Sequence, residues 1–278
     1  MASYINDRFV NDEDAVLHVF DLSIQRGYGI FDFFRVVDGQ PLYMDFHLKR
    51  FYGSARAMHL SVPYEPDQIK AIAHQLVQNT SGKEQGIRIT LTGGYSANGY
   101  SLATPNLIMT CGPVKICNEA DFEKGFNIIT HEHIREFPEV KSINYLMAVW
   151  LQPLLVERKA DDVLYHKNGI ISEFPRANVF IVTHDKKLAT PAKNVLPGIT
   201  RRNIIELAGN VMPVEVRDIS VDELMAAPEV FLASTTKLVM PIVKINDKPV
   251  GDGTPGEYSR ILYSKLLQFE KRAETPVA

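Results

Sequence analysis

The sequence is poor in cysteine, since Cys111 and Cys117 are the only two in 278 residues. Two cysteines are too few for a disulfide framework, so both are expected to be free thiols. No stretch is apolar for long enough to cross a bilayer, and the N-terminus lacks the apolar run of a signal peptide. The formal net charge of −3 offers no basic field to nucleic acid or an anionic membrane. These absences predict a soluble, cytoplasmic protein with neither kind of partner.

Hydrophobic residues, in contrast, make up 45% of the chain, which is ample for a large core. The composition turns polar between residues 112 and 123, and we interpret this stretch as a linker. It would join a small N-terminal α/β domain, residues 1–111, to a large C-terminal domain, residues 124–278. Strands and helices are mixed in both parts, which indicates an α+β fold. A ligand commonly binds between two such domains.

The N-terminal part contains two predicted helices, at residues 45–59 and 67–78. Apolar residues recur there at spacings of three and four, as on one face of a helix. Ile87, Ile89 and Leu91 alternate with polar residues, which predicts a strand over residues 86–92. A second strand is expected at residues 107–111.

The C-terminal part is rich in predicted strands. Asn168-Gly169 separates two short apolar runs, which is a strong hairpin signal. Strands are expected at residues 126–130, 163–165, 170–171, 179–182, 214–216, 230–233 and 238–245, and helices at 142–159, 200–208, 221–226 and 256–273. Pro153 should kink the first of these helices. Ser220 and Glu223 are spaced as a capping box for the third.

Five short motifs carry polar chemistry along the chain. They are His47-Leu48-Lys49-Arg50, Lys141-Ser142-Ile143-Asn144, Ser172-Glu173 with Asn178-Val179-Phe180, Leu196-Pro197-Gly198-Ile199-Thr200-Arg201, and Ser234-Thr235-Thr236. A lysine can form a Schiff base, and a carboxylate can keep a pyridine nitrogen protonated. An arginine, a helix start and hydroxyl-bearing turns can bind phosphate. Together these groups are what pyridoxal 5'-phosphate requires.

In identity and order, the five motifs resemble those of the class IV aminotransferases, the fold type IV pyridoxal-phosphate enzymes. The resemblance covers nearly the whole chain and is most specific at the cofactor motifs. It implies two α/β domains with the cofactor at their interface. It also implies a homodimer with its active sites near the subunit interface.

The resemblance assigns a role to each cofactor residue. Lys141 holds the cofactor as a Schiff base and then moves a proton between the substrate Cα and the cofactor C4'. Glu173 binds the pyridine nitrogen, and Asn178, in the same signature, is a further cofactor-binding residue. The phosphate ligands are Arg50, Ile199, Thr200, Ser234 and Thr235. Taken singly, Lys141 and Glu173 would be ordinary surface residues, and Thr200 would simply cap its own helix.

The expected substrate pocket departs from the better-known family patterns. Phe31 stands where D-amino-acid transaminases have a tyrosine, and residues 93–100 lack the arginine and histidine that clamp the substrate carboxylate in those enzymes. Three arginines fall near the expected pocket, and guanidinium groups suit carboxylates. Surface salt bridges are the alternative role for each of them. The predicted substrate-binding residues are Arg26, Arg88, Arg176, Phe31, Phe33 and Thr236, and the partner chain is an alternative source of Arg26.

A positive pocket favours dicarboxylic partners such as glutamate and 2-oxoglutarate, together with small acids such as alanine and pyruvate. We therefore expect a D-amino-acid transaminase with ping-pong kinetics. A branched-chain L-amino-acid aminotransferase is the alternative, followed by aminodeoxychorismate lyase. A non-catalytic cofactor-binding module is the alternative from a different class. No metal site is predicted, because His131-Glu132-His133 has no evident third ligand.

Overall fold

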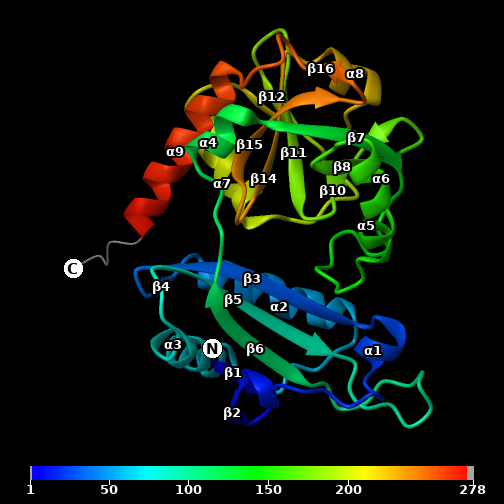
Figure 1. The fold of residues 1–278 in the computed structure, drawn as a ribbon, viewed down its shortest axis with the longest axis vertical. Helices are drawn as coiled ribbons and strands as arrows, with labels where there is room; N and C mark the ends of the chain where they lie inside the picture. Colours follow the sequence, from blue (N-terminus) through cyan, green and yellow to red (C-terminus); the bar gives the residue numbers. More distant parts are fainter. Residues whose placement is uncertain (1, 274–278) are drawn as a thin grey trace. The chain divides into compact units, whose positions relative to one another are not determined.

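The computed structural model describes residues 2–273 (Figure 1). Contacts divide the chain into two units. Unit 1 contains the residues up to Lys115 together with Val140–Asn144, and unit 2 contains Ile116–Glu139 and Tyr145–Arg272. The domain limits predicted from composition stay a prediction. That prediction did not include the return of Val140–Asn144 to unit 1.

Unit 1 is built on a six-stranded antiparallel sheet with the strand order β2-β1-β6-β5-β3-β4. The strands are β1 (Ala2–Ile5), β2 (Arg8–Asn11), β3 (Gly29–Val37), β4 (Gln40–Pro41), β5 (Glu84–Thr92) and β6 (Leu107–Pro113). The helices are α1 (Leu22–Arg26), α2 (Met44–Ala57) and α3 (Pro66–Gln78), with a short 3-10 turn at Asp12–Asp14. The helices expected at residues 45–59 and 67–78 are confirmed as α2 and α3. The strands expected at 86–92 and 107–111 are confirmed as β5 and β6.

The core of unit 1 lies between this sheet and the two longer helices, which cover one of its faces (Figure 1). Phe51 of α2 and Ile69 of α3 are fully buried against Phe34 and Ile89 of the sheet. Burying each such side chain contributes about 1.5–3 kcal/mol. Side chains alternate along β3, so its odd-numbered residues, including Phe31, lie on the opposite face.

The segment Val140–Asn144 adds itself to the edge of β3 near its start. The N–H of Phe31 donates to the Lys141 carbonyl at 2.9 Å, and the N–H of Ile143 donates to the Gly29 carbonyl at 3.0 Å. Ser142 forms an antiparallel bridge with Ile30. The predicted helix over residues 142–159 is therefore wrong at its start, because these backbone groups bond to a strand.

Unit 2 is built on a ten-stranded mixed sheet with the main order β13-β12-β11-β14-β15-β7-β8-β9. The strands are β7 (Phe126–Glu132), β8 (Asp162–Lys167), β9 (Ile170–Ile171), β10 (Glu173–Phe174), β11 (Ala177–Val182), β12 (Leu188–Thr190), β13 (Val214–Val216), β14 (Glu229–Ser234), β15 (Leu238–Ile245) and β16 (Lys248–Pro249). The turn between β8 and β9 has positive φ at Asn168 (49°) and Gly169 (75°), which confirms the predicted hairpin.

The helices of unit 2 are α4 (Glu119–Lys124), α5 (Leu146–Trp150), α6 (Gln152–Glu157), α7 (Ile199–Ala208), α8 (Val221–Ala226) and α9 (Glu257–Ala273). The interruption between α5 and α6 falls at Leu151, just before Pro153. Proline has no N–H to continue the helical ladder, so the predicted kink is confirmed. α4 overlaps the end of the stretch that we expected to be a linker and extends one residue beyond it, and Asn118 and Asp121 form its capping box. No helix within residues 2–273 is long and apolar enough to span a membrane.

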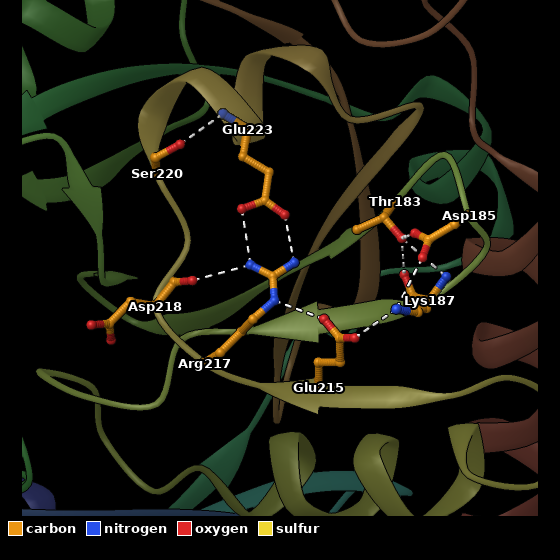
Figure 2. Close-up of polar contacts among 8 residues, drawn as sticks. All are labelled: Thr183, Asp185, Lys187, Glu215, Arg217, Asp218, Ser220 and Glu223. Carbon is orange, nitrogen blue, oxygen red and sulfur yellow. Dashed lines mark hydrogen bonds and ion pairs between the residues drawn. The ribbon is translucent and has the colours of Figure 1, made fainter.

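The capping box predicted at the start of α8 is only half formed. Ser220 Oγ accepts from the N–H of Glu223, as expected, at 3.0 Å. The Glu223 carboxylate, however, receives both terminal nitrogens of Arg217 at 2.9 and 2.5 Å instead of returning to Ser220 (Figure 2). Arg217 also binds Glu215, which in turn contacts Lys187, so the network connects the turn before β12 with β13 and α8. Hydrogen bonds to the two glutamates hold the pKa of Arg217 above its usual value.

Candidate active site

Lys141 and Arg88 lie beside one aromatic ring in unit 1. Lys141 Nζ is 4.7 Å from the centroid of the Phe31 ring, and the Arg88 guanidinium carbon is 4.0 Å from it. Phe33 pairs with Arg88 across β3 and β5 and lies on the same face of the sheet. Two cations are thus held beside an aromatic surface, where a cation is attracted to the ring. Of the predicted substrate residues, Phe31, Phe33 and Arg88 are brought together with Lys141.

Arg50 lies on α2 and binds a buried carboxylate of β3. Its Nε and Nη2 donate to the two oxygens of Asp32 at 2.9 and 2.8 Å. His47 Nδ1 lies 2.7 Å from the same carboxylate. Asp32 is fully buried, so this pairing offsets a charge that would otherwise be costly. The resemblance had given Arg50 as a phosphate ligand, and the structure shows its Nε and Nη2 bound to Asp32.

The electrostatics of this cluster follow from burial and pairing. Burial opposes ionisation of Asp32, but Arg50 and the hydrogen bond from His47 hold the pKa of its carboxyl below the usual range. Burial is also the main reason that the pKa of His47 lies below its ordinary value. The ring is therefore neutral at neutral pH, with Nδ1 as the donor to the carboxylate. Arg50 is therefore held by two hydrogen bonds to a buried, ionised Asp32 carboxylate.

Glu173 begins β10 in unit 2, and each of its carboxylate oxygens is held by a donor. Oε1 accepts from Arg135 Nε at 2.7 Å and lies 2.6 Å from Arg135 Nη2. Oε2 accepts from the backbone N–H of Leu196 at 2.8 Å. The Glu173 side chain is 5% exposed and that of Arg135 is 13% exposed. Sequence reasoning missed Arg135, because nothing in its polar surroundings distinguishes it from a surface arginine.

Asn178 pairs with Glu173 across β10 and β11 and contacts the same loop. Its side-chain amide donates to the Leu196 carbonyl at 2.9 Å. Glu173 and Asn178 therefore hold opposite ends of one residue, the donor and the acceptor of Leu196. A Cβ on Gly198 would lie only 2.1 Å from Asn178 Oδ1, so only glycine allows this close approach. The described contacts make Asn178 a support for the loop that leads into α7.

The start of α7 has the features of an anion site. Gly198 is its N-cap and offers no side-chain capping bond, so the helix begins at Ile199 and Thr200 lies in its first turn. Thr200 therefore does not cap the helix, and that alternative is wrong. Backbone N–H groups in the first turn of a helix have no partner within that helix, so they are able to donate to a bound anion.

The predicted hydroxyl-bearing turn joins β14 to β15. Ser234 ends β14, and its Oγ accepts from the Lys237 N–H at 3.2 Å. The Thr236 carbonyl accepts from the Cys117 N–H at 2.9 Å. Thr235 lies between them, and all three hydroxyl-bearing residues are partly exposed. The turn is thus held by the Ser234 hydroxyl and by the Thr236 carbonyl, with all three hydroxyl-bearing side chains partly exposed in unit 2.

The two other predicted arginines occupy different places. Arg26 ends α1 and is exposed, with Nη1 donating to the Gln25 carbonyl at 2.8 Å. Arg176 is exposed in the turn between β10 and β11. It lines a cavity of about 560 Å³ in unit 2, together with residues of α5 and α6. No described contact within unit 1 brings Arg26 to Arg88.

The donor set fits the cofactor that the motifs predict. Unit 1 presents an amine in Lys141 and a fixed guanidinium in Arg50. Unit 2 presents a buried carboxylate in Glu173, an uncapped helix start and a turn with three hydroxyl groups. A pyridine nitrogen, an aldehyde and a phosphate are the complements of these groups. No group of three or more potential metal-ligating His, Cys, Asp or Glu side chains was found among the described residues.

Comparison with known proteins agrees with this chemistry. The family model "Amino-transferase class IV" matches residues 29–245. D-alanine aminotransferase of Staphylococcus epidermidis is 31% identical over 95% of this chain and 97% of its own length. The corresponding Listeria innocua protein is 28% identical over 98% and 97%.

Solved structures of branched-chain amino acid aminotransferases share the fold. The enzyme of Thermoproteus uzoniensis with norvaline gives a TM-score of 0.88 at 22% identity, over 99% of this chain and 96% of that one. The Escherichia coli enzyme gives 0.87 at 22% identity, over 99% and 96%. A further branched-chain enzyme, solved with pyridoxamine 5'-phosphate, gives 0.90 at 24% identity, over 99% and 95%. The two-domain fold type IV architecture is thereby confirmed. This chain belongs to the class IV aminotransferases, which are pyridoxal-phosphate-dependent transaminases acting on amino acids and 2-oxo acids.

Proposed function

We propose that this protein is a D-amino-acid transaminase that exchanges an amino group between D-alanine or D-glutamate and pyruvate or 2-oxoglutarate. The observation that carries the proposal is the full-length similarity to D-alanine aminotransferases, at 31% identity for the Staphylococcus epidermidis protein. The likeness to branched-chain enzymes lies below 25% identity and concerns the fold alone. The Arg88 guanidinium beside Phe31 supports a substrate that carries a carboxylate.

Residues of both units would hold the cofactor. Lys141 would provide the covalent link and Glu173 the partner of the pyridine nitrogen. The phosphate would be held by Arg50, Ile199, Thr200, Ser234 and Thr235. We assign Asn178 to the support of the Leu196 loop rather than to direct contact. When bound, pyridoxal phosphate supplies the electron-withdrawing ring that stabilises negative charge at the substrate Cα.

Lys141 would act first as the base that removes the proton from the substrate Cα. It would then act as the acid that delivers a proton to the cofactor C4'. The Phe31 ring limits where its amine can lie, since Nζ is 4.7 Å from the ring centroid. Arg88 would bind the substrate α-carboxylate, because its guanidinium is held against the same ring. Arg26, Arg176, Phe33 and Thr236 would complete the pocket. We further propose that the protein is a homodimer and that Arg26 acts in the partner's site.

The decisive experiment compares amino transfer to 2-oxoglutarate from D-alanine and from L-leucine, with pyruvate release from aminodeoxychorismate assayed beside them. Transfer from D-alanine alone is the expected result. Transfer from L-leucine alone would contradict the proposal and favour a branched-chain enzyme. Release of pyruvate without an acceptor would indicate the lyase. Lys141→Ala is the matched control, because it should retain the fold and lose all three activities.

A further inference from the structure

Arg135 contacts Glu173, although nothing in the sequence had indicated that it would lie there. Its guanidinium contacts a single oxygen of Glu173 through both Nε and Nη2, at 2.7 and 2.6 Å. Nη2 also donates to the Pro138 carbonyl at 2.5 Å. The arginine is therefore fixed by its own backbone neighbour while it holds the carboxylate. None of the five motifs contains it.

The ion pair between Arg135 and Glu173 is buried, where a carboxylate without a counter-charge would be unfavourable. Glu173 is 4% exposed, and a buried charge without a counter-charge is costly. Removing one partner of such a pair leaves the other charge uncompensated. Arg135 thus allows Glu173 to remain ionised in a buried position before any ligand arrives.

The contacts to Glu173 also fix the orientation of its carboxylate group. Arg135 holds Oε1 while the Leu196 N–H holds Oε2, so the carboxylate plane is fixed at both ends. An ionised carboxylate only accepts hydrogen bonds, so Glu173 must stay charged if it is to receive an N–H from the cofactor, as in the proposed function. The direction in which that donor must approach is set by the two contacts already made. An ion pair that served stability alone would not need the second oxygen to be held.

We propose that Arg135 is a positioning residue that keeps Glu173 charged and oriented toward the pyridine nitrogen of the cofactor. The proposal rests on the role given to Glu173 in the proposed function. It assigns no direct contact with substrate or cofactor to Arg135 itself. Arg135 would act entirely through the carboxylate.

The test measures cofactor binding rather than activity. Cofactor-free protein is titrated with pyridoxal phosphate between pH 5.5 and 9, and the visible absorption band gives the Kd. Arg135→Gln should raise the Kd about tenfold at neutral pH, within the range of coupling between contacting residues. The loss should grow as the pH falls, because an unpaired buried carboxylate takes up a proton and ceases to be an acceptor. Arg135→Lys keeps the charge but cannot make the contact through two nitrogens, so it should give a smaller loss of affinity and a smaller shift of the pH profile.

The background variant Glu173→Gln separates positioning from direct contact. In this background Arg135→Gln should change the Kd less than about threefold, because the group through which it acts is gone. An equal loss in both backgrounds would overturn the proposal and indicate that Arg135 binds the ligand itself. An unchanged Kd and pH profile for Arg135→Gln would also overturn it. Arg158→Gln is the matched control, since Arg158 is in the same unit and half exposed.

Two further outcomes are distinguishable. If Arg135→Gln does not fold, judged by circular dichroism, the comparison is made with Arg135→Lys in both backgrounds, where a shifted pH profile only in the presence of Glu173 supports the proposal. A profile that is unshifted, or shifted equally in both, refutes it. Failure of the wild-type protein to bind pyridoxal phosphate would instead refute the proposed function.

Discussion

At the scale of single residues, Arg88 is the predicted carboxylate ligand with the most defined surroundings. All three arginines are exposed, but the Arg88 guanidinium carbon lies 4.0 Å from the Phe31 ring centroid, beside Lys141, whereas Arg26 is at a helix end and Arg176 is in a turn. Arg88→Gln should therefore raise the KM for D-alanine about tenfold or more, since a hydrogen bond to a charged group contributes about 1.5–3 kcal/mol. Steady-state kinetics measure this change, and the cofactor Kd should stay unchanged.

Arg56→Gln is the control for this experiment, because Arg56 is an exposed arginine of α2 in the same unit. It should leave the KM as it is. If Arg88→Gln behaves like this control while Arg176→Gln or Arg26→Gln raises the KM, the α-carboxylate is bound by one of those arginines instead.

Asp32 and His47 predict how stability depends on pH. The folded-state pKa of His47 is lowered, so the unfolded chain takes up the proton first, below about pH 6.5. The folded-state pKa of Asp32 is also lowered, so its contribution is present above about pH 4 and is lost as the pH falls further. The urea midpoint of the cofactor-free protein should therefore fall in two stages, measured at pH 7, 6, 5, 4 and 3.

His47→Gln should reduce the first stage and leave the second, since burial also lowers the pKa of His133 and its contribution remains. Asp32→Asn should lower stability at pH 7 by about 3 kcal/mol, because Arg50 then lacks its buried partner. His74→Gln provides the control, since His74 is exposed on α3. If His47→Gln retains the full loss between pH 7 and 5, another group is responsible for it.

At the scale of secondary-structure elements, the start of α7 depends on a close approach between Gly198 and Asn178. Gly198→Ala should cost about 1–3 kcal/mol of stability, because the new Cβ would overlap Asn178 Oδ1. It should also weaken cofactor binding, as the helix start moves. In Asn178→Ala protein the same substitution should cost clearly less, since its obstacle has been removed.

Thermal unfolding and cofactor titration measure both effects. Gly209→Ala is the matched control at the other end of α7, where the nearest atom to a new Cβ is 3.5 Å away. It should be neutral. Equal costs for Gly198→Ala in both backgrounds would show that Asn178 is not the reason for the glycine.

The ion-pair network around Arg217 is expected to be a modest stabiliser (Figure 2). Arg217 joins Glu215 to Glu223, but its side chain is 35% exposed and water screens the pairing. Arg217→Gln should lower stability by less than about 1 kcal/mol, and the loss should shrink in high salt. Thermal melts at low and high salt measure this. A large, salt-independent loss would mean that packing of the arginine, rather than its charge, is what matters.

The sequence predicted most of the long elements, because α2, α3 and β5 have regular apolar spacing. It did not predict β3, whose residues are nearly all buried on both faces and so show no alternation. It also misplaced residues 142–145 in a helix, since their bonding to β3 depends on residues more than 100 positions away. The motifs pointed to Lys141, Glu173 and the start of α7 as cofactor ligands, and these roles stay predictions. Asp32 and Arg135 could not be recognised from the sequence. Only the folded chain shows that Asp32 meets Arg50 and that Arg135 meets Glu173.

At the scale of the whole molecule, the chain leaves unit 1 at Ile116 and returns to it for Val140–Asn144, the segment that includes Lys141. The proposed cofactor ligands are thus divided, with Lys141 and Arg50 in unit 1 and Glu173 and the α7 start in unit 2. A ligand stabilises whatever it binds, by about 2.7 kcal/mol when its concentration is 100 times the Kd. Pyridoxal phosphate should therefore raise the thermal midpoints of both units.

Calorimetry with and without the cofactor measures the two units together, and fluorescence of the single tryptophan, Trp150 in α5, reports on unit 2. Lys141→Ala removes the covalent link in unit 1, so it should reduce the cofactor-induced rise of the calorimetric midpoint. A rise confined to the tryptophan signal, unaltered in Lys141→Ala, would mean that the cofactor is held by unit 2 alone. The role given to Lys141 would then be wrong, although the phosphate and pyridine contacts could stand.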